Sequence, residues 1–248
     1  MGRTLCVVNQ KGGVGKTTTA VNLAVALAKS GARTLLIDLD PQCNATTGLG
    51  ETPAESHPLV AGTPLQPALR RIGTDSLDLL PGSRAFRDVE ALARDDQRQS
   101  ARLRHQLASA RTGYDFAVLD CPPSGGALTK TALAGSTEVF MPIQCEYFAM
   151  EGLAQMIEII REVMDSNPGE LQFGGILLTM YDGALELTWE VEAEVRDFFG
   201  EIVYRTVIPR DVAVAEAPSH GKSVIDYAPR SRAARAYLEL CMEVLERD

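Results

Sequence analysis

The sequence lacks the usual marks of a secreted, membrane-spanning or zinc-binding protein. Its 248 residues include five cysteines, an odd number without C-x-x-C spacing, which argues against a disulfide framework or a zinc site. No apolar run approaches the roughly 20 residues of a membrane span. Gly2 and Arg3 lead directly into a predicted strand rather than an apolar leader. We therefore expect a cytoplasmic protein with reduced thiols.

Positive charge is also scarce. The chain has 24 Lys and Arg against 33 Asp and Glu, a formal net charge of −9. This balance disfavours non-specific nucleic-acid binding unless basic residues gather on one face. With 45% hydrophobic residues the composition is that of a globular protein. The length suits one large α/β domain spanning residues 1–248.

A glycine-rich run carries the strongest functional signal. It lies between the apolar stretch Leu5–Val8 and the apolar-periodic stretch Ala20–Ala28, the strand–loop–helix context of a phosphate-binding loop. Backbone N–H groups and the following helix N-terminus are expected to bind nucleotide phosphates. Lys16 is expected to reach the β- and γ-phosphates, and the Thr17 hydroxyl to bind Mg²⁺. The run consists of Lys11, Gly12, Gly13, Val14, Gly15, Lys16, Thr17 and Thr18.

This loop departs from the usual G-x-x-x-x-G-K-[ST] pattern. The first glycine of the pattern is replaced by Gln10, and a second lysine, Lys11, follows it. Two lysines supply more positive charge than one nucleotide needs in its own pocket. We therefore expect Lys11 to serve a second nucleotide across a dimer interface.

Carboxylates at strand ends supply the remaining candidates. Asp120 closes the apolar run Phe116–Asp120, and the prolines that follow hold it at the strand end, so we assign it to Mg²⁺. Asp38 and Asp40 share one face of the preceding predicted strand, so spacing does not choose between them. Asp40 lies nearer the carboxyl end, where α/β sites form, and is assigned to the attacking water. Asp38 is expected either to help hold Mg²⁺ or to form a structural hydrogen bond that holds the loop.

Apolar runs alternating with helical patterns predict an α/β fold: a P-loop NTPase with a mostly parallel, twisted central sheet and helices on both faces. The segment 51–73 is expected to be a surface excursion with one short helix. Helices are expected at Thr17–Ser30, Ala101–Ala110, Leu153–Asp165, Thr188–Phe199 and Arg232–Arg247. Strands are expected at Leu5–Asn9, Arg33–Leu39, Leu77–Leu80, Phe116–Asp120, Glu138–Ile143, Phe173–Thr179 and Val203–Val207.

Six motifs together resemble the ParA/Soj family of partition ATPases, part of the deviant Walker A (MinD/ParA) superfamily. The resemblance runs from residue 3 nearly to the end, with only residues 51–111 loosely matched. The motifs occur in family order and spacing at Gln10–Thr18, Asp38–Gly50, Asp120–Ser124, Leu178–Asp182, Val207–Arg210 and Glu216–Lys222.

The resemblance implies an ATPase that binds ATP and Mg²⁺ and forms a homodimer with two ATP molecules between the protomers. It implies that Lys11 contacts the partner's nucleotide and that Asp40 orients the water. Hydrolysis would be slow until a ParB-type partner stimulates it. The implied magnesium ligands are Thr17, Asp40 and Asp120, and the implied adenine-side contacts are Tyr181, Asp182, Pro209 and Asp211.

Family members in their ATP-bound dimeric form bind DNA without sequence preference, but this chain departs from the family at the DNA contacts. Ala184 and Ala213 stand where arginines are expected, and Glu186 and Asp211 add negative charge. Residues 183–200 carry five acidic residues and one arginine, a net −4. The remaining candidates for a DNA contact, and so for association with the nucleoid, are Arg205, Lys222, Arg230, Arg232 and Arg235.

Two functions stay open from sequence. In one, the chain is a DNA-binding chromosome or plasmid partition ATPase. In the other, its ATP-bound dimer binds DNA weakly or not at all, and instead positions another cargo or recruits a protein partner or polymer. A membrane-binding MinD-like role is not favoured, because the chain ends in an acidic helix rather than a basic amphipathic one. Trp189 and the Met180–Tyr181 pair are expected to be packing residues or an adenine wall.

Overall fold

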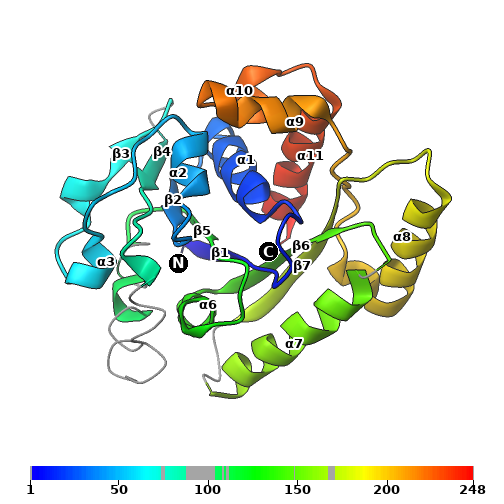
Figure 1. Ribbon diagram of the computed structural model, residues 1–248, viewed down its shortest axis with the longest axis horizontal. Coiled ribbons are helices and arrows are strands. Elements are labelled where there is room, and N and C mark those ends of the chain that lie inside the picture. Colours follow the sequence, from blue (N-terminus) through cyan, green and yellow to red (C-terminus); the bar gives the residue numbers. More distant parts are fainter. Residues whose placement is uncertain are drawn as a thin grey trace.

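The computed structural model describes residues 2–73, 76–87, 104–107, 109, 112–147, 149–166 and 171–247. A seven-stranded sheet organises them, in the order β3-β4-β2-β5-β1-β6-β7 (Figure 1). All neighbours are parallel except β3, which pairs antiparallel with β4 at one edge. The strands are β1 (Arg3–Val7), β2 (Thr34–Asp38), β3 (Arg70–Arg71), β4 (Leu77–Leu80), β5 (Phe116–Asp120), β6 (Glu138–Gln144) and β7 (Gln172–Thr179).

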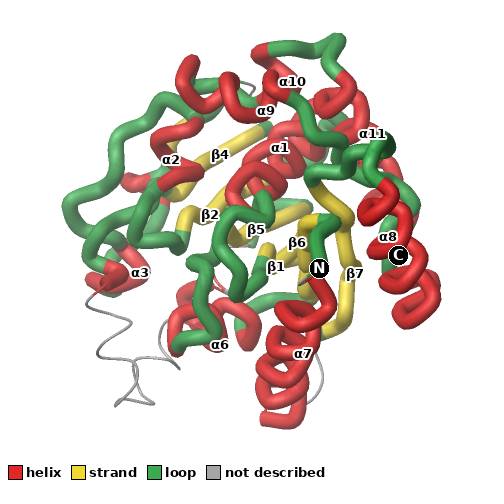
Figure 2. Tube along the Cα trace, turned by 45° about the vertical axis from the view of Figure 1, so that its right-hand side comes forward, coloured by secondary structure: helices red, strands yellow, loops and turns green. Residues whose placement is uncertain are grey.

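Helices cover both faces of this sheet, as Figures 1 and 2 show. One face carries α1 (Lys16–Lys29) and α11 (Arg232–Glu246), with the short α10 (Val224–Tyr227) packed on both. The other face carries α6 (Ala127–Ala134), α7 (Ala149–Ser166) and α8 (Glu186–Phe199). Short elements fill the loops: α2 (Asn44–Gly48), α3 (Pro58–Ala61), α9 (Val212–Glu216) and the 3₁₀ turns Gln66–Ala68, Gly200–Ile202 and Ala217–His220.

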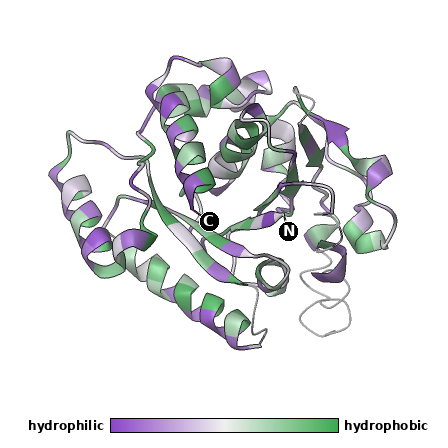
Figure 3. Ribbon diagram, turned by 180° about the vertical axis from the view of Figure 1, so that it is seen from behind, coloured by the Kyte–Doolittle hydropathy of each residue, from purple (hydrophilic) through white to green (hydrophobic). Residues whose placement is uncertain are grey.

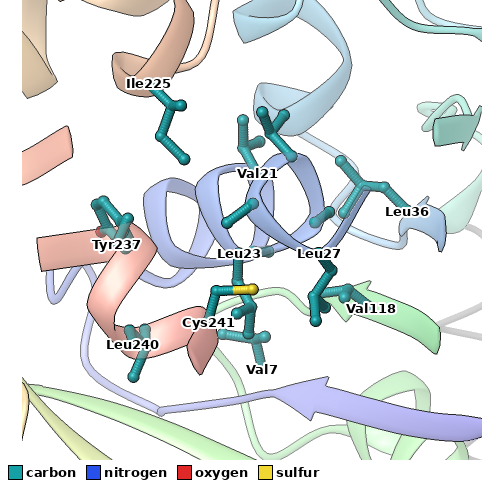
Figure 4. Packing of buried hydrophobic residues seen from close by; sticks show 14 of the residues in the cluster. Val7, Val21, Leu23, Leu27, Leu36, Val118, Ile225, Tyr237, Leu240 and Cys241 are labelled. Atoms are coloured by element: carbon teal, nitrogen blue, oxygen red, sulfur yellow. The ribbon is translucent and has the colours of Figure 1, made fainter. Parts of the chain in front are cut away.

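Successive side chains of the central strands point to opposite faces of the sheet, so the core forms two clusters. Leu5 and Val7 of β1 face α1 and α11, whereas Cys6 faces the α6–α7 side. Figure 4 shows Leu23 of α1 pointing toward Val7, and Leu27 toward Val118, on the strands. Hydrophilic and hydrophobic residues mix along α7 in the view from behind (Figure 3), typical of an amphipathic covering helix. Because the central strands are buried on both faces, they read in sequence as continuous apolar runs.

The observed fold confirms the predicted class, and the predicted ranges of β4 and β5 match residue for residue. The predicted strand at 203–207 is wrong. Only Val203 bridges to a neighbour, Ile176. Tyr204 N–H still donates to the Ile176 carbonyl at 2.9 Å, but the N–H groups of Arg205 and Thr206 donate to the Glu243 carboxylate of α11 at 2.8 and 3.1 Å. A side chain thus takes the hydrogen bonds that a sheet would need.

Half of the predicted helix at 101–110 lies outside the described residues, and the described half, 104–107 and 109, is helical. Segment 51–73 contains the short helix α3 and also β3, which was not predicted. Trp189 was expected to be a packing residue or part of an adenine wall, and its 59% exposure contradicts the packing role. Across the described residues we find no helix with the length and apolar character needed to cross a bilayer.

Candidate nucleotide and magnesium site

The glycine-rich loop joins β1 to α1 at the carboxyl edge of the sheet. Gly13 and Gly15 have φ values of 79° and 88°, a left-handed conformation that favours glycine. A side chain at Gly12 or Gly13 would meet no atom within 4 Å, so the loop surface is open there. Gly15 is the N-cap of α1, and no side chain caps the helix. The first N–H groups of α1 are therefore available to an anion.

The two loop lysines have different surroundings. Lys16 is buried, and its Nζ donates to the Lys11 carbonyl at 2.9 Å. Burial lowers the Lys16 pKa, while the Asp120 and Asp40 carboxylates oppose the shift. Lys11 is partly exposed, and its Nζ lies 3.1 Å from Glu146 Oε2. The Gln144 side chain donates to the other Glu146 oxygen and so orients that carboxylate.

Asp120 lies at the end of β5 in a fully buried position, paired in register with Val7 of β1 and Asp38 of β2. Neither of its carboxylate oxygens has a hydrogen-bond partner. Burial raises the Asp120 pKa well above its usual value, and the Asp38 carboxylate adds to the shift. The neighbouring Thr17 hydroxyl and Lys16 ammonium oppose it. A buried carboxylate without a partner is costly unless a cation approaches it.

Asp38 and Asp40 are distinguished by their hydrogen bonds. The fully buried Asp38 accepts from Thr46 N–H at 2.9 Å, from the Thr46 hydroxyl at 2.6 Å and from Asp40 N–H at 3.2 Å. Burial raises its pKa to about 6, against these bonds. The Asp40 carboxylate accepts from Gln42 N–H at 2.8 Å. Asp38 is thus used to fix α2 beside the sheet, and Asp40 has the greater capacity left for a ligand.

The donor set suits magnesium rather than a self-contained metal centre. Within the described ranges, no three His, Cys, Asp or Glu side chains gather as metal ligands. Mg²⁺ is usually held by one or two carboxylates together with substrate phosphates and waters. The unpartnered oxygens of Asp120, next to Thr17 and the phosphate loop, fit that pattern.

The adenine-side candidates lie together after β7. Thr179 at the strand end contacts the Val14 carbonyl through its hydroxyl at 2.9 Å, which places β7 against the phosphate loop. Tyr181 then bridges to Pro209, and its hydroxyl donates to Glu192 of α8 at 2.6 Å. Asp182 accepts from Ala184 N–H at 3.1 Å, which closes a turn.

Asp211 has a structural task that sequence reasoning missed. Its carboxylate caps α9 through Ala213 N–H at 3.1 Å and also accepts from Ala233 N–H at 3.2 Å, in the first turn of α11. Glu146 was missed as well. It follows β6 at the same edge of the sheet, so an acidic residue after a strand, the signal that identified Asp120, would have found it.

The five basic candidates do not form one patch. Arg230, Arg232 and Arg235 are exposed around the start of α11 and make no ion pair with any described residue. Lys222 is exposed just before α10. Arg205 pairs with Glu246 at 3.3 Å, at the opposite end of α11. The 15 residues from Arg232 to Glu246 span about 20 Å of helix, so Arg205 is separate.

Comparison with known proteins identifies relatives along the whole chain. A family model described as an AAA domain matches residues 2–173. The chain is 43% identical to the sporulation initiation inhibitor protein Soj of Bacillus subtilis, covering 98% of each chain. It is 45% identical to the chromosome-partitioning ATPase Soj of Thermus thermophilus, covering 99% of this chain and 96% of that one. The chromosome partitioning protein ParA of Caulobacter vibrioides is 43% identical, with 99% and 95% covered.

Solved structures share the fold. A cobyrinic acid a,c-diamide synthase from Mycobacterium smegmatis, with bound ATP analogue and magnesium, superposes with a TM-score of 0.84 at 32% identity. The comparison covers 99% of this chain and 95% of that one. The septum site-determining protein MinD from Pyrococcus horikoshii, complexed with Mg-ADP, gives a TM-score of 0.79 at 25% identity, with 99% and 97% covered.

Proposed function

The chain belongs to the family of Soj and ParA chromosome-partitioning ATPases, and from this premise we propose a working cycle for it. It is an ATPase that uses ATP and Mg²⁺. We propose that it dimerises on ATP, binds DNA in that state, and leaves it when a ParB-type partner stimulates hydrolysis. The unpartnered buried carboxylate of Asp120, beside the phosphate loop, supports Mg²⁺ binding. The observation that carries the dimer is Lys11, which pairs with Glu146 outside its own phosphate loop.

Each residue at the loop has a defined task in this cycle. The α1 N-terminus and the loop N–H groups bind the phosphates, and Lys16 exchanges its bond to the Lys11 carbonyl for phosphate oxygens. Thr17 and Asp120, with Asp40 nearby, hold Mg²⁺, which when bound neutralises charge on the β- and γ-phosphates. Asp40 orients the attacking water. Asp38 keeps α2 and the Asp40 backbone in place.

Lys11 gives the cycle its dependence on a second protomer. In the single chain it pairs with Glu146 instead of turning into its own phosphate loop. We propose that it leaves this carboxylate for the nucleotide of the partner. No arginine adjoins the loop in sequence, so unstimulated hydrolysis should be slow, and a partner should accelerate it by about 10³-fold or more.

For DNA we propose the exposed arginines Arg230, Arg232 and Arg235 as the contact. They are free of carboxylate partners within the described part of the chain and gather at one end of α11. The alternative function, in which the ATP-bound dimer recruits a protein, is favoured by the acidic surface of α8, which begins at Glu186, and by Ala184 in the turn before it, where the family pattern has an arginine.

Light scattering with ATP and Mg²⁺ tests the cycle. The wild type should change from monomer to dimer, whereas Lys11→Ala should bind ATP and stay monomeric. A matched control is Lys130→Ala, which removes a lysine paired with Glu162 away from the loop. An ATP-dependent dimer of Lys11→Ala would refute the role across the interface, and a monomeric wild type would refute the cycle.

A further inference from the structure

The solvent side of α8 exposes large apolar side chains. The helix buries Thr188, Val191 and Val195 against the sheet. On the other side Trp189 is 59% exposed and Phe198 is 75% exposed, and Leu187 is also open to water at 41%. Exposed apolar residues that recur along one element, with polar residues between them, are typical of an interaction site.

Acidic residues run between these apolar side chains. Glu186, Glu190 and Glu194 follow at intervals of four, so they line one face of the helix, and Asp197 continues it one turn later. All four are exposed, and none makes an ion pair with another described residue. Glu192 differs, because it faces inward to Tyr181 and Arg196. At 100° per residue, Trp189 flanks the acidic line on one side, and Leu187 and Phe198 flank it on the other.

The acidic line destabilises α8 as long as no partner covers it. Like charges spaced i, i+4 each cost the helix a few tenths of a kcal/mol, and no cation on the chain compensates here among the described residues. The acidic line also repels DNA, an anionic membrane surface and the same face of a second copy. A partner that carries positive charge, with apolar side chains beside it, matches both properties.

We infer that this face of α8 is a docking surface for a basic amphipathic segment of a partner protein. We call it the α8 face and define it by Glu186, Leu187, Trp189, Glu190, Glu194, Asp197 and Phe198. Lysines or arginines of the segment lie along the acidic line, and its apolar residues cover Phe198 and Leu187 on one side and Trp189 on the other. Desolvated aromatic side chains supply most of the affinity, and the charges set the partner's sign and its rate of association.

The inference goes beyond the proposed cycle and does not depend on it. Docking is measured on the protein without nucleotide, whereas the cycle is measured through ATP-dependent dimerisation. A failure of one therefore leaves the other standing.

Trp189 supplies the readout, because it is the sole tryptophan of the chain and lies on the α8 face. The probe is an 18-residue synthetic helical peptide of leucine, lysine and alanine, with one apolar side, one basic side and no tryptophan. Its scrambled isomer, of equal charge but without an apolar side, is the control. We expect the amphipathic peptide to shift Trp189 emission to the blue, and binding to weaken with salt. The scrambled isomer should bind about tenfold more weakly.

Two variants with the same change of net charge distinguish binding at the α8 face from attraction to the net charge of the protein. Glu190→Lys with Glu194→Lys changes the acidic line, whereas Glu158→Lys with Glu239→Lys makes the same change of net charge at exposed positions on α7 and α11. In the first variant, two glutamates that would pair with lysines of the peptide become lysines, so peptide binding should weaken about tenfold. The second variant should lose less than about twofold. All four positions are exposed, so both variants should melt near the wild-type temperature.

Three results would overturn the inference. The first is an equal loss in both charge-reversal variants, which would mean attraction to net charge alone. The second is no blue shift at any peptide concentration. The third is nucleotide-free self-association of the wild type that Phe198→Ser abolishes, which would assign the α8 face to a second copy of the chain.

Discussion

Carboxylates crowd together in two regions of this molecule, with opposite consequences. At the sheet edge, Asp38, Asp40 and Asp120 are buried, and burial raises the pKa of Asp38 and of Asp120. On α8, Glu186, Glu190, Glu194 and Asp197 are exposed to water. The buried group stores unfavourable energy that a bound cation relieves. The exposed group costs little in stability, and its main effect is to attract positively charged molecules and repel negatively charged ones.

The difference shows how function can be retained and altered in one chain. The nucleotide site is fixed by backbone geometry, register and buried hydrogen bonds, so we expect substitutions there to be costly. The surface of α8 is free of such constraints. We expect Ala184 and Ala213, where the family resemblance implies arginines, and the added acidic residues to change which partners bind, while the ATP site is kept.

The strongest test of the buried region is Lys16→Ala. We expect ATP affinity to fall by about 100-fold or more, because several charge-assisted hydrogen bonds to phosphate are lost. Calorimetric titration with ATP and Mg²⁺ measures it. Lys222→Ala, an exposed lysine before α10, is the control and should bind as the wild type does. Unchanged affinity in Lys16→Ala would place the phosphates elsewhere.

Asp40→Ala and Asp38→Ala should separate the two neighbouring carboxylates. Asp40→Ala should keep ATP binding and lose about 100-fold in hydrolysis, trapping the ATP-bound dimer. Asp38→Ala should instead lower the free energy of unfolding by about 2–3 kcal/mol, since Thr46 and the Asp40 N–H lose their buried acceptor. Phosphate release and urea unfolding measure these effects. Normal hydrolysis by Asp40→Ala would assign the water to Asp38 or another group.

The raised pKa of Asp120 predicts pH-dependent magnesium binding. A carboxyl whose pKa is raised keeps its proton to higher pH, so Mg²⁺ must displace that proton. Affinity for Mg²⁺ in the presence of ATP should therefore rise with pH, by up to about tenfold per unit, and level off above the pKa. Calorimetry in two buffers of different ionisation enthalpy counts the proton released. A pH-independent affinity with no proton release would show that Asp120 is ionised before the metal binds.

The smallest expected effect concerns Glu146, which holds Lys11 in the single chain. Glu146→Gln should strengthen ATP-dependent dimerisation about two- to fivefold, because a partly exposed ion pair contributes less than about 1 kcal/mol. Light scattering over a concentration series detects it. Glu162→Gln breaks the pair with Lys130 away from the loop and should leave dimerisation unchanged. Weaker dimerisation of Glu146→Gln would mean that Glu146 belongs to the interface itself.

Local sequence patterns predicted the buried centre well and the surface poorly. The ranges of β4 and β5 match because apolar runs between polar turns leave no alternative. Spacing alone did not separate Asp38 from Asp40, because the deciding contacts come from Thr46, eight residues away from Asp38. The predicted strand at 203–207 was wrong because Glu243, 37 to 38 residues further on, takes its N–H groups. Trp189 was expected to pack, although its exposure depends on where α8 lies in the fold.

The central claim is that the chain keeps its ATP site and that its ATP-bound dimer binds DNA at the start of α11, although alanines stand at Ala184 and Ala213, where the family resemblance implies arginines. It is tested by gel shift of the ATP-loaded Asp40→Ala protein on random duplex DNA, across a salt series. We predict binding that weakens steeply with salt. Adding Arg232→Ala and Arg235→Ala should weaken it further and reduce the salt slope by about 0.9 per contact removed. Absence of binding even at low salt would contradict the claim and favour the alternative function, in which the ATP-bound dimer recruits a protein.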